Sequence, residues 1–183
     1  RIIGSVEIQT GGTAGNWSNA ATKIQVMGPG VRRTGDIVQV RYTQTGASAT
    51  GTTTIPLDDT IPQNTEGDEY MTQAITPSSS VNRLLIEADL AISNSAIANM
   101  TVALFQDNTA DALAATCETI DTAANPYFVS LRHAMSAGTA SATTLKIRAG
   151  GSVAGTTTFN GFSGARKFGG VSASSLRVTE IFT

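Results

Sequence analysis

The sequence predicts an all-β domain: an antiparallel β-sandwich of jelly-roll type with about eight strands and at most one short helix. Apolar and polar side chains alternate along most apolar segments, which is the two-residue period of strands. The connections between these segments are short and rich in Gly, Pro, Asn and Ser. The composition favours small and hydroxyl-bearing residues, with 27 Thr, 16 Ser, 25 Ala and 18 Gly among 183 residues.

The N-terminal segment, residues 1–35, has the weakest pattern. A glycine-rich stretch at 11–16 precedes Trp17, the single tryptophan of the chain. Residues 22–27 alternate between apolar and polar side chains before Gly and Pro interrupt them. We expect residues 1–35 to form an N-terminal arm or a leading hairpin, and residues 36–183 to form the sandwich.

The first half of the sandwich alternates between strands and turn signals. Residues 36–43 form a clear strand with alternating faces. Residues 45–54 contain only Gly, Ala, Ser and Thr, which predicts a long turn or a flat edge. Residues 55–70 contain two prolines and a glycine and are therefore expected to form a loop. Residues 71–75 are expected to form a short strand.

Residues 75–92 are the best-defined stretch of the sequence. They open with the turn signal Thr-Pro-Ser-Ser-Ser at 76–80 and continue as a regularly alternating run. A helix is the competing interpretation of this run, but the preceding turn and the two-residue period favour a strand. We therefore expect a central strand whose core face carries Leu84, Ile86, Ala88, Leu90 and Ile92.

The second half of the sandwich contributes further strands and one ambiguous segment. Residues 100–106 are apolar on both faces, which predicts either a central position or a subunit contact. Residues 108–118 are compatible with a short capped helix or with a strand of small residues. Three more strands are expected, at 127–135, 144–149 and 171–182.

Composition and charge narrow the classes of function. Charged residues make up 14% of the chain and the net charge is −2, so neither nucleic acid nor an anionic membrane is an expected partner. There is no apolar run long enough for a transmembrane helix. Cys117 is the single cysteine, so an internal disulfide is impossible, and we expect it to be a small buried or half-buried side chain.

The chain lacks the usual signatures of catalysis. His133 is the single histidine and lies on the apolar side of its segment, which favours a packed core or interface residue. No G-x-S-x-G elbow and no phosphate-binding loop is present. One His and one Cys are too few for a His/Cys metal site. The sequence therefore predicts a protein that is not an enzyme and needs no cofactor.

The loop at 55–70 concentrates carboxylates. Grouped oxygen ligands are what Ca²⁺ prefers, although the spacing matches no twelve-residue calcium loop. A solvated acidic loop is the favoured interpretation, and a cation site is the alternative. The candidate ligands are Asp58, Asp59, Glu66, Asp68 and Glu69.

Additional apolar faces suggest burial between subunits, so we expect a homo-oligomer, with a trimer favoured. The candidate interface residues are Met100, Val102, Phe105 and His133. Binding of a host glycan would use aromatic side chains with polar edges. The candidates for such receptor binding are Trp17, Tyr42, Tyr70 and Tyr127.

The stretch 75–86, which reads ITPSSS followed by NRLLI after one residue, resembles a module found in tailed-phage and prophage tail-fibre or appendage proteins. The likeness extends over roughly residues 36–182. Its other parts are 52–56, 59–62, 102–107, 166–170 and 175–181. The resemblance implies a trimeric jelly-roll knob, akin to tumour-necrosis-factor-like heads, on the surface of a virion. It transfers no functional residue position by position.

Three functions are compatible with this resemblance. The first is a tail-fibre or appendage knob that attaches to a host surface glycan or protein, with other virion proteins as partners. The alternative is a capsid decoration protein, such as a head cement or head fibre protein, without receptor binding. The least favoured is a hydrolase that acts on a surface polysaccharide.

Overall fold

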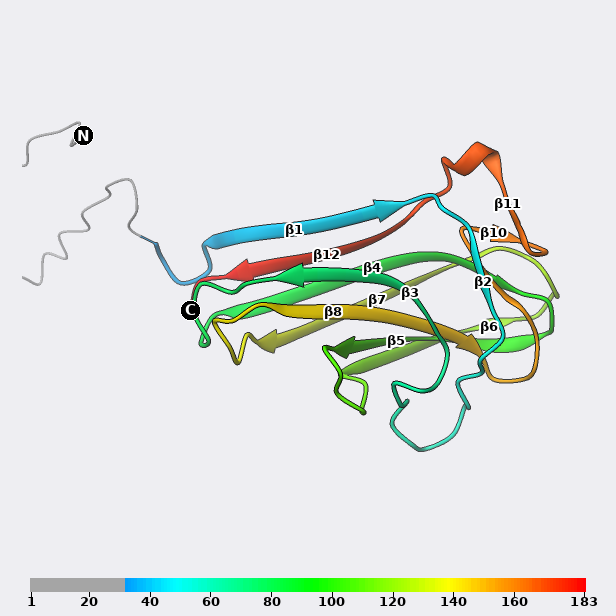
Figure 1. The fold of residues 1–183 in the computed structure, drawn as a ribbon, viewed down its shortest axis with the longest axis horizontal. Coiled ribbons are helices and arrows are strands. Elements are labelled where there is room, and N and C mark those ends of the chain that lie inside the picture. The colour runs from blue at the N-terminus through cyan, green and yellow to red at the C-terminus, as the bar shows by residue number, and fades with distance from the viewer. Residues whose placement is uncertain (1–31) are drawn as a thin grey trace, which may run out of the picture. The chain divides into compact units, whose positions relative to one another are not determined.

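The computed structural model describes residues 32–183, which form antiparallel strands joined mostly by short connections (Figure 1). The expected arm or hairpin at 1–35 lies outside the described residues except for its last four positions. Within residues 32–183 no helix is long and apolar enough to cross a membrane. The elements are β1 Ile37–Thr45, β2 Ala49–Gly51, β3 Asp68–Ile75, β4 Arg83–Asn94, β5 Ala98–Gln106, β6 Ala114–Ile120, β7 Tyr127–Ser136, β8 Thr143–Gly151, β9 Thr157–Phe159, β10 Gly161–Phe162, β11 Ala165–Arg166, the 3₁₀ turn η2 Phe168–Gly170, and β12 Ser174–Ile181.

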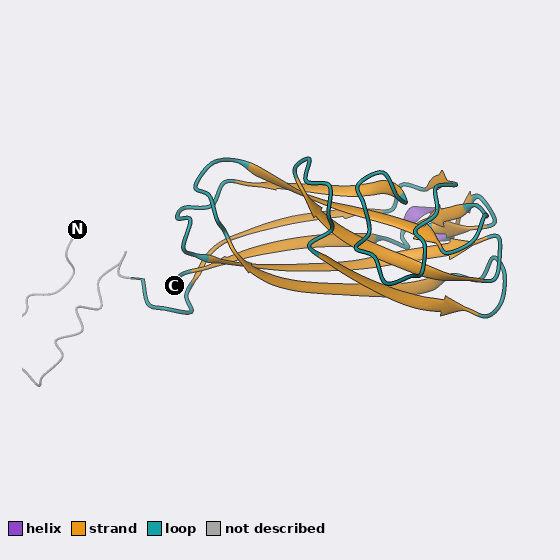
Figure 2. Ribbon diagram, turned by 90° about the horizontal axis from the view of Figure 1, so that it is seen from below, coloured by secondary structure: helices purple, strands orange, loops and turns teal. Residues whose placement is uncertain are grey.

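The pairing of the long strands is that of a jelly roll. One sheet has the order β1-β12-β4-β7. In the same sheet β9 pairs with the last three residues of β4, and β2 pairs with β9. The second sheet has the order β3-β8-β5-β6. Among the eight strands of seven or more residues, the first pairs with the eighth, the second with the seventh, the third with the sixth and the fourth with the fifth. This is the pattern of a long antiparallel hairpin folded over into two sheets. The expected all-β sandwich is confirmed, and Figure 2 shows its strands with most turns at the two ends.

The core lies between the two sheets, and β4 runs through its centre. β4 pairs with β12 on one edge and with β7 on the other, so it is an internal strand as expected. Its alternation is the predicted one, because the five residues assigned to the core face are all buried. These side chains pack against the inner face of the second sheet. The inner residues of the two sheets include Leu84, Ile86, Leu90, Met100, Val102, Leu104, Leu145, Ile147, Leu176 and Val178.

The ambiguous segment at 108–118 ends in a strand, β6, which pairs with β5. Within the described chain β6 lies at the edge of the second sheet. Cys117 on this strand is exposed, so the expectation of a buried or half-buried thiol was wrong. Strand alternation sends every second side chain of β6 away from the core, and the small size of Cys117 does not alter that geometry.

The apolar faces of β5 are both covered by the same chain. Met100 and Val102 lie in the core between the sheets, while Phe105 packs on the opposite face with Ile55 from the loop before β3. All three predicted interface residues of β5 are almost completely inaccessible, so they do not form a subunit contact. The central position, which was the other interpretation, is the correct one. His133 is half-buried on β7, opposite the core residue Ile86 of β4.

A buried carboxylate accepts hydrogen bonds from the turn that precedes β4. Glu180 of β12 is completely inaccessible to solvent and accepts four hydrogen bonds. Gln39 Nε2 and Asn82 Nδ2 each donate to it at 2.6 Å. Ser78 donates through its backbone N–H at 2.8 Å and through its hydroxyl at 2.7 Å. Neutral donors from β1, the turn and the start of β4 therefore surround one carboxylate, and no ion pair reaches it within the described part of the chain.

The hydrogen bonds decide the charge of Glu180. Burial raises the pKa of this carboxyl group, but hydrogen bonds from Gln39, Asn82 and Ser78 outweigh burial and leave the pKa at about 2. The folded-state pKa thus lies below the usual value of 4.5. The stability that this shift provides is present above pH 4.5 and is lost as the pH falls towards 2.

We expect Glu180→Gln to lower the free energy of unfolding by about 2 kcal/mol at neutral pH, because a carboxamide cannot accept all four hydrogen bonds. The wild-type protein should lose up to about 3 kcal/mol between pH 4.5 and pH 2 through this group, and the variant should lack that loss. Urea unfolding midpoints at several pH values and one protein concentration measure both effects.

The control is Glu118→Gln, which removes an exposed carboxylate from β6 and should leave the midpoint unchanged. Equal urea midpoints for wild type and Glu180→Gln across this pH range would contradict an ionised, hydrogen-bonded Glu180.

Candidate functional site

The outer face of the first sheet carries side chains that point away from the core. The strand register places them in rows that cross the sheet. One row consists of Val40 of β1, Thr179 of β12, Leu85 of β4 and Ala134 of β7. The next row towards the C-terminal end of β12 contains Ile37, Ile181, Arg83 of β4 and Ser136 of β7. Five of the eight outward side chains in these two rows are therefore apolar.

We call the set Ile37, Val40, Leu85, Ala134 and Ile181 the outer apolar patch. Ile37 is 65% exposed and Val40 is 46% exposed, whereas Leu85 and Ile181 are partly covered by their neighbours. The outer face formed by β1, β12, β4 and β7 thus presents large apolar side chains to solvent, chiefly from β1. Exposed apolar patches of this kind mark interaction surfaces.

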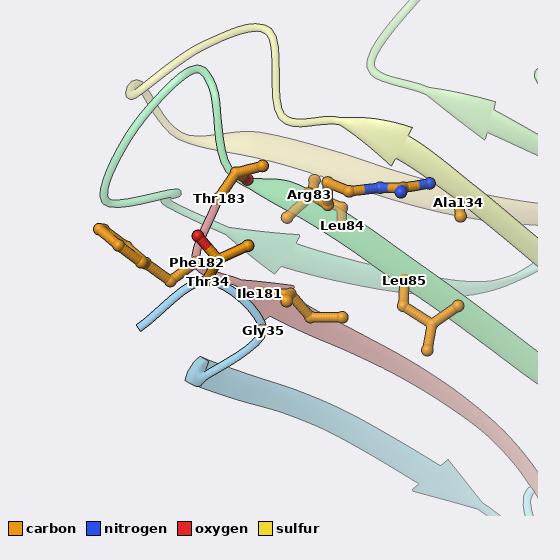
Figure 3. A pocket seen from close by; sticks show the side chains of 9 residues that line it. All are labelled: Thr34, Gly35, Arg83, Leu84, Leu85, Ala134, Ile181, Phe182 and Thr183. Carbon is orange, nitrogen blue, oxygen red and sulfur yellow. The ribbon is translucent and has the colours of Figure 1, made fainter. Parts of the chain in front are cut away.

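A cavity of about 410 Å³ adjoins the outer apolar patch (Figure 3). The side chains of Leu85 and Ile181 come from adjacent strands and line it together with Phe182. Gly35 donates its N–H to the carbonyl of Phe182 at 2.8 Å, so the segment before β1 is tied to the segment after β12 beside the cavity. The patch is therefore not flat, because it continues into a hollow that another side chain can fill.

Charged residues border the outer apolar patch on the same face, towards the N-terminal end of β12. The next row contains Arg177 of β12, Glu87 of β4 and Arg132 of β7. Arg177 Nε donates to Glu87 Oε2 at 2.8 Å, and Arg132 Nε lies 3.9 Å from Glu87 Oε1. Beyond this row, the β10–β11 hairpin contacts the sheet: the hydroxyl of Ser93 donates to the carbonyl of Gly161. The uncovered part of the face has an apolar centre and a polar rim, which is the anatomy of a subunit interface.

The carboxylates of the predicted cation loop do not converge. Asp58 accepts hydrogen bonds from the side chain and the backbone of Thr60, which lower the pKa of Asp58. Asp68 and Glu69 are adjacent in β3, and their side chains have different partners. Asp68 bonds to Thr53 near β2, whereas Glu69 lies near Lys146 on the outer face.

Within residues 32–183 no group of three or more His, Cys, Asp or Glu side chains is placed to hold a metal ion. The expectation of a cation site in this loop was therefore wrong. The loop instead carries separate carboxylates, which are Asp58, Asp59, Glu66, Asp68 and Glu69. The physical reason is strand alternation within β3 and a tight turn at Asp58, neither of which the clustering in sequence reveals.

The three described aromatic candidates for receptor binding lie on different strands. Trp17 is outside the described residues. Tyr42 is exposed on the outer face of β1, at the end of the charged row. Tyr70 stacks on Phe159 with ring centroids 5.1 Å apart. Tyr127 on β7 donates its hydroxyl to Asp121 at 2.5 Å, which raises the pKa of Tyr127. The three described tyrosines belong to three different strands and do not form one aromatic platform.

Tyr70 is a packing residue. Its hydroxyl oxygen is buried and has no hydrogen-bond partner in the described structure. Burial, with a smaller contribution from the charge of Asp68, raises the pKa of Tyr70. A ring stacked inside the protein with an unsatisfied hydroxyl offers nothing to an external ligand.

One sequence pattern indicates the outer apolar patch. Leu85 interrupts the otherwise polar face of the central strand, and an apolar side chain on a wet face is a sign of contact with a neighbour. Ile37, Val40 and Ile181 carry no such signal by themselves. Only the register of β1, β12 and β4 brings them beside Leu85.

Comparison with known families finds one match. The family model described as Pgp3 C-terminal domain matches residues 50–182, which is most of the chain and nearly all of the described sandwich. No curated protein matches the chain.

Several solved structures are similar to the chain at low identity. The sugar-binding protein described as EclA C-terminal domain is 16% identical with a TM-score of 0.38, covering 87% of this chain and 99% of its own. The enzymatically active domain of tailspike protein 4 from bacteriophage CBA120 is 15% identical with a TM-score of 0.30, and the match covers 68% of this chain and 19% of that chain. The VP2 subviral particle of infectious bursal disease virus is 13% identical with a TM-score of 0.33, and the match covers 81% of this chain and 39% of that chain. Values this low assign no function.

We expect Tyr70→Phe to leave the free energy of unfolding unchanged or to raise it by up to about 1 kcal/mol, because it removes a buried hydroxyl without a partner. Tyr127→Phe is the matched control. It removes a hydroxyl that is bonded to Asp121 and should not stabilise the protein. Chemical unfolding of both variants measures the difference. A larger loss of stability in Tyr70→Phe than in Tyr127→Phe would show that the Tyr70 hydroxyl has a partner.

Proposed function

The chain belongs to the Pgp3 C-terminal domain family, and on this premise we propose that it is a non-enzymatic β knob. It assembles as a homotrimer through the outer apolar patch. On the surface of a phage virion, the trimer attaches the particle to its host. The family membership supports a structural or binding β domain, and the phage setting rests on the resemblance of residues 75–86 to tail-fibre and appendage modules.

The outer apolar patch is the observation that carries this proposal. Ile37 and Val40 are exposed next to Leu85 and Ile181, with an unfilled hollow beside them. A second copy that fills the hollow removes this apolar surface from water, at about 25 cal/mol for each Å² buried. The charged row of Arg177, Glu87 and Arg132 at the rim then sets the orientation of the partner.

A trimer is favoured over a dimer because the resembling knobs are trimeric and because a heterologous contact can close into a ring. In such a ring each copy offers its patch to a different surface of the next copy. The apolar patch is then buried in every subunit, and no copy is left with an open face.

Two features support a binding role over a catalytic one. The imidazole of His133 is half-buried and makes no hydrogen bond within the described residues, so it has no nucleophile to activate. The low charge and the many hydroxyl groups of the chain suit a surface that must remain soluble while it contacts a host.

We expect Leu85→Asp to convert the trimer into a monomer, because a carboxylate in the centre of an apolar interface has no partner. Light scattering coupled to size-exclusion chromatography measures the mass. Circular dichroism should be unchanged, since the Leu85 side chain points outward. Val153→Asp is the control: it places the same charge at an exposed apolar position outside the patch and should leave the trimer intact.

The oligomer proposal fails if wild-type protein is a monomer or if Leu85→Asp keeps the wild-type mass. Attachment is tested separately, with fluorescent wild-type protein and Leu85→Asp on a panel of bacterial cells. We expect binding by the trimer and a loss of tenfold or more (roughly the lower limit of an avidity effect) in the monomer. Absence of binding to all cells would contradict the attachment role.

A further inference from the structure

We propose that a polar pocket on the outer face of the second sheet binds a single neutral sugar ring through the side chains of Lys146, Glu69 and Arg148. This inference rests on the proposed attachment function, for which it names a ligand class and a site. The pocket belongs to the opposite sheet from the outer apolar patch, so the two sites share no residue.

Four parts of the chain meet at this pocket, whose volume is about 240 Å³. Strand β8 provides Lys146 and Arg148, and the adjacent strand β3 provides Glu69. The loop before β3 and the turn after β5 provide amide side chains at Asn64 and Asn108. The lining is therefore mostly polar, with both signs of charge and two amides.

The walls of the pocket are held by hydrogen bonds within the protein. Arg148 donates from Nε to the carbonyl of Glu66 at 2.8 Å and from Nη2 to the carbonyl of Gly67 at 2.6 Å. Asp107 accepts from the hydroxyl of Thr143 and from the N–H of Thr144, both at 2.8 Å. These contacts fix the pocket before a ligand arrives, which reduces the entropy lost on binding.

Other groups in the pocket are left without a hydrogen bond. Lys146 Nζ lies 3.7 Å and Arg148 Nη1 lies 3.9 Å from the same oxygen, Glu69 Oε2, which is too far for a hydrogen bond. The side chains of Lys146 and Arg148 are only 26% and 19% exposed. Two partly desolvated cations thus form ion pairs with one carboxylate oxygen, and all three groups line the pocket beside them.

A hydroxyl group fits this arrangement because it both donates and accepts. It can accept from Lys146 or Arg148 and donate to Glu69 at the same time. Two hydroxyls on adjacent ring carbons would use both cations. Asn64 Nδ2 donates to the carbonyls of Asn108 and Thr109, which leaves the amide oxygen of Asn64 and the side-chain amide of Asn108 for a ligand at the rim.

Charge and size narrow the ligand further. Two cations and the two carboxylates of Glu69 and Asp107 give the pocket no net charge, so neither an anion nor a cation is favoured over a neutral group. The volume corresponds to about eight water molecules at ~30 Å³ each. That is below the size of a pocket for a drug-sized ligand. A terminal monosaccharide of a glycan has the matching chemistry and size.

The test is saturation-transfer NMR on the wild-type protein with the methyl glycosides of glucose, galactose, mannose and fucose and with sodium glucuronate. Sodium phosphate has no carbon-bound proton, so its binding is followed by ³¹P line broadening at equal ionic strength. We expect at least one neutral glycoside to give a saturable signal with a dissociation constant in the millimolar range, as befits so small a ligand. Lys146→Met and Glu69→Gln should each reduce that signal about fivefold or more.

Matched controls are Lys167→Met, whose ammonium lies 4.0 Å from the centre of the Phe162 ring and outside the pocket, and Glu118→Gln on β6. Both should bind as wild type does. The proposal is overturned if no glycoside gives a signal at concentrations of about 50 mM, if only glucuronate or phosphate binds, or if Lys146→Met and Lys167→Met bind equally well.

The experiments can contradict the sugar-binding proposal and the attachment proposal independently of each other. If wild type and Lys146→Met bind cells equally, the pocket is not the receptor site although attachment stands. If wild type binds no cell but a glycoside saturates the pocket, the sugar site stands and the attachment role does not. Light scattering should give the same trimer mass for every variant, which excludes loss of fold or assembly as the cause.

Discussion

The buried carboxylate of Glu180 is the interaction on which the arrangement of the first sheet depends. It joins β12 to Gln39 of β1 and to the turn before β4 through Ser78 and Asn82. A one-residue slip of β12 would turn its outward side chains into the core and place Glu180 in water. By opposing such a slip, the hydrogen bonds of Glu180 keep Ile181 on the outer face, where it completes the outer apolar patch.

The outer faces of the two sheets present different kinds of surface. The first sheet offers an apolar patch with a charged rim, which suits contact with another copy of the chain. The second sheet covers its outer face with the loop before β3, where Ile55 packs on Phe105 and where Gly67 anchors Arg148. The same loop thus closes a small apolar cluster and builds a polar pocket. The proposed subunit contact and the proposed sugar pocket therefore lie on different sheets.

The sequence-based expectations succeeded where the physical cause is local and failed where it is not. Alternation placed Leu84, Ile86 and Leu90 in the core, because side-chain direction in a strand depends on the strand alone. The cation-site alternative failed because it treated Asp68 and Glu69 as one cluster, whereas their side chains have different partners. The interface expectation at Phe105 was wrong because an apolar outer face does not reveal whether a loop of the same chain covers it.

The sequence by itself determined the strands, the turn signals and the core faces, because each follows from the conformation and hydrophobicity of neighbouring residues. Only the tertiary structure decided where polar side chains meet. Gln39 and Glu180 are 141 positions apart, and Lys146 and Glu69 come from strands separated by much of the chain. These meetings arise because the first long strand pairs with the eighth and the second with the seventh. Strand pairing at such separation depends on the packing of the whole sandwich, which no local pattern encodes.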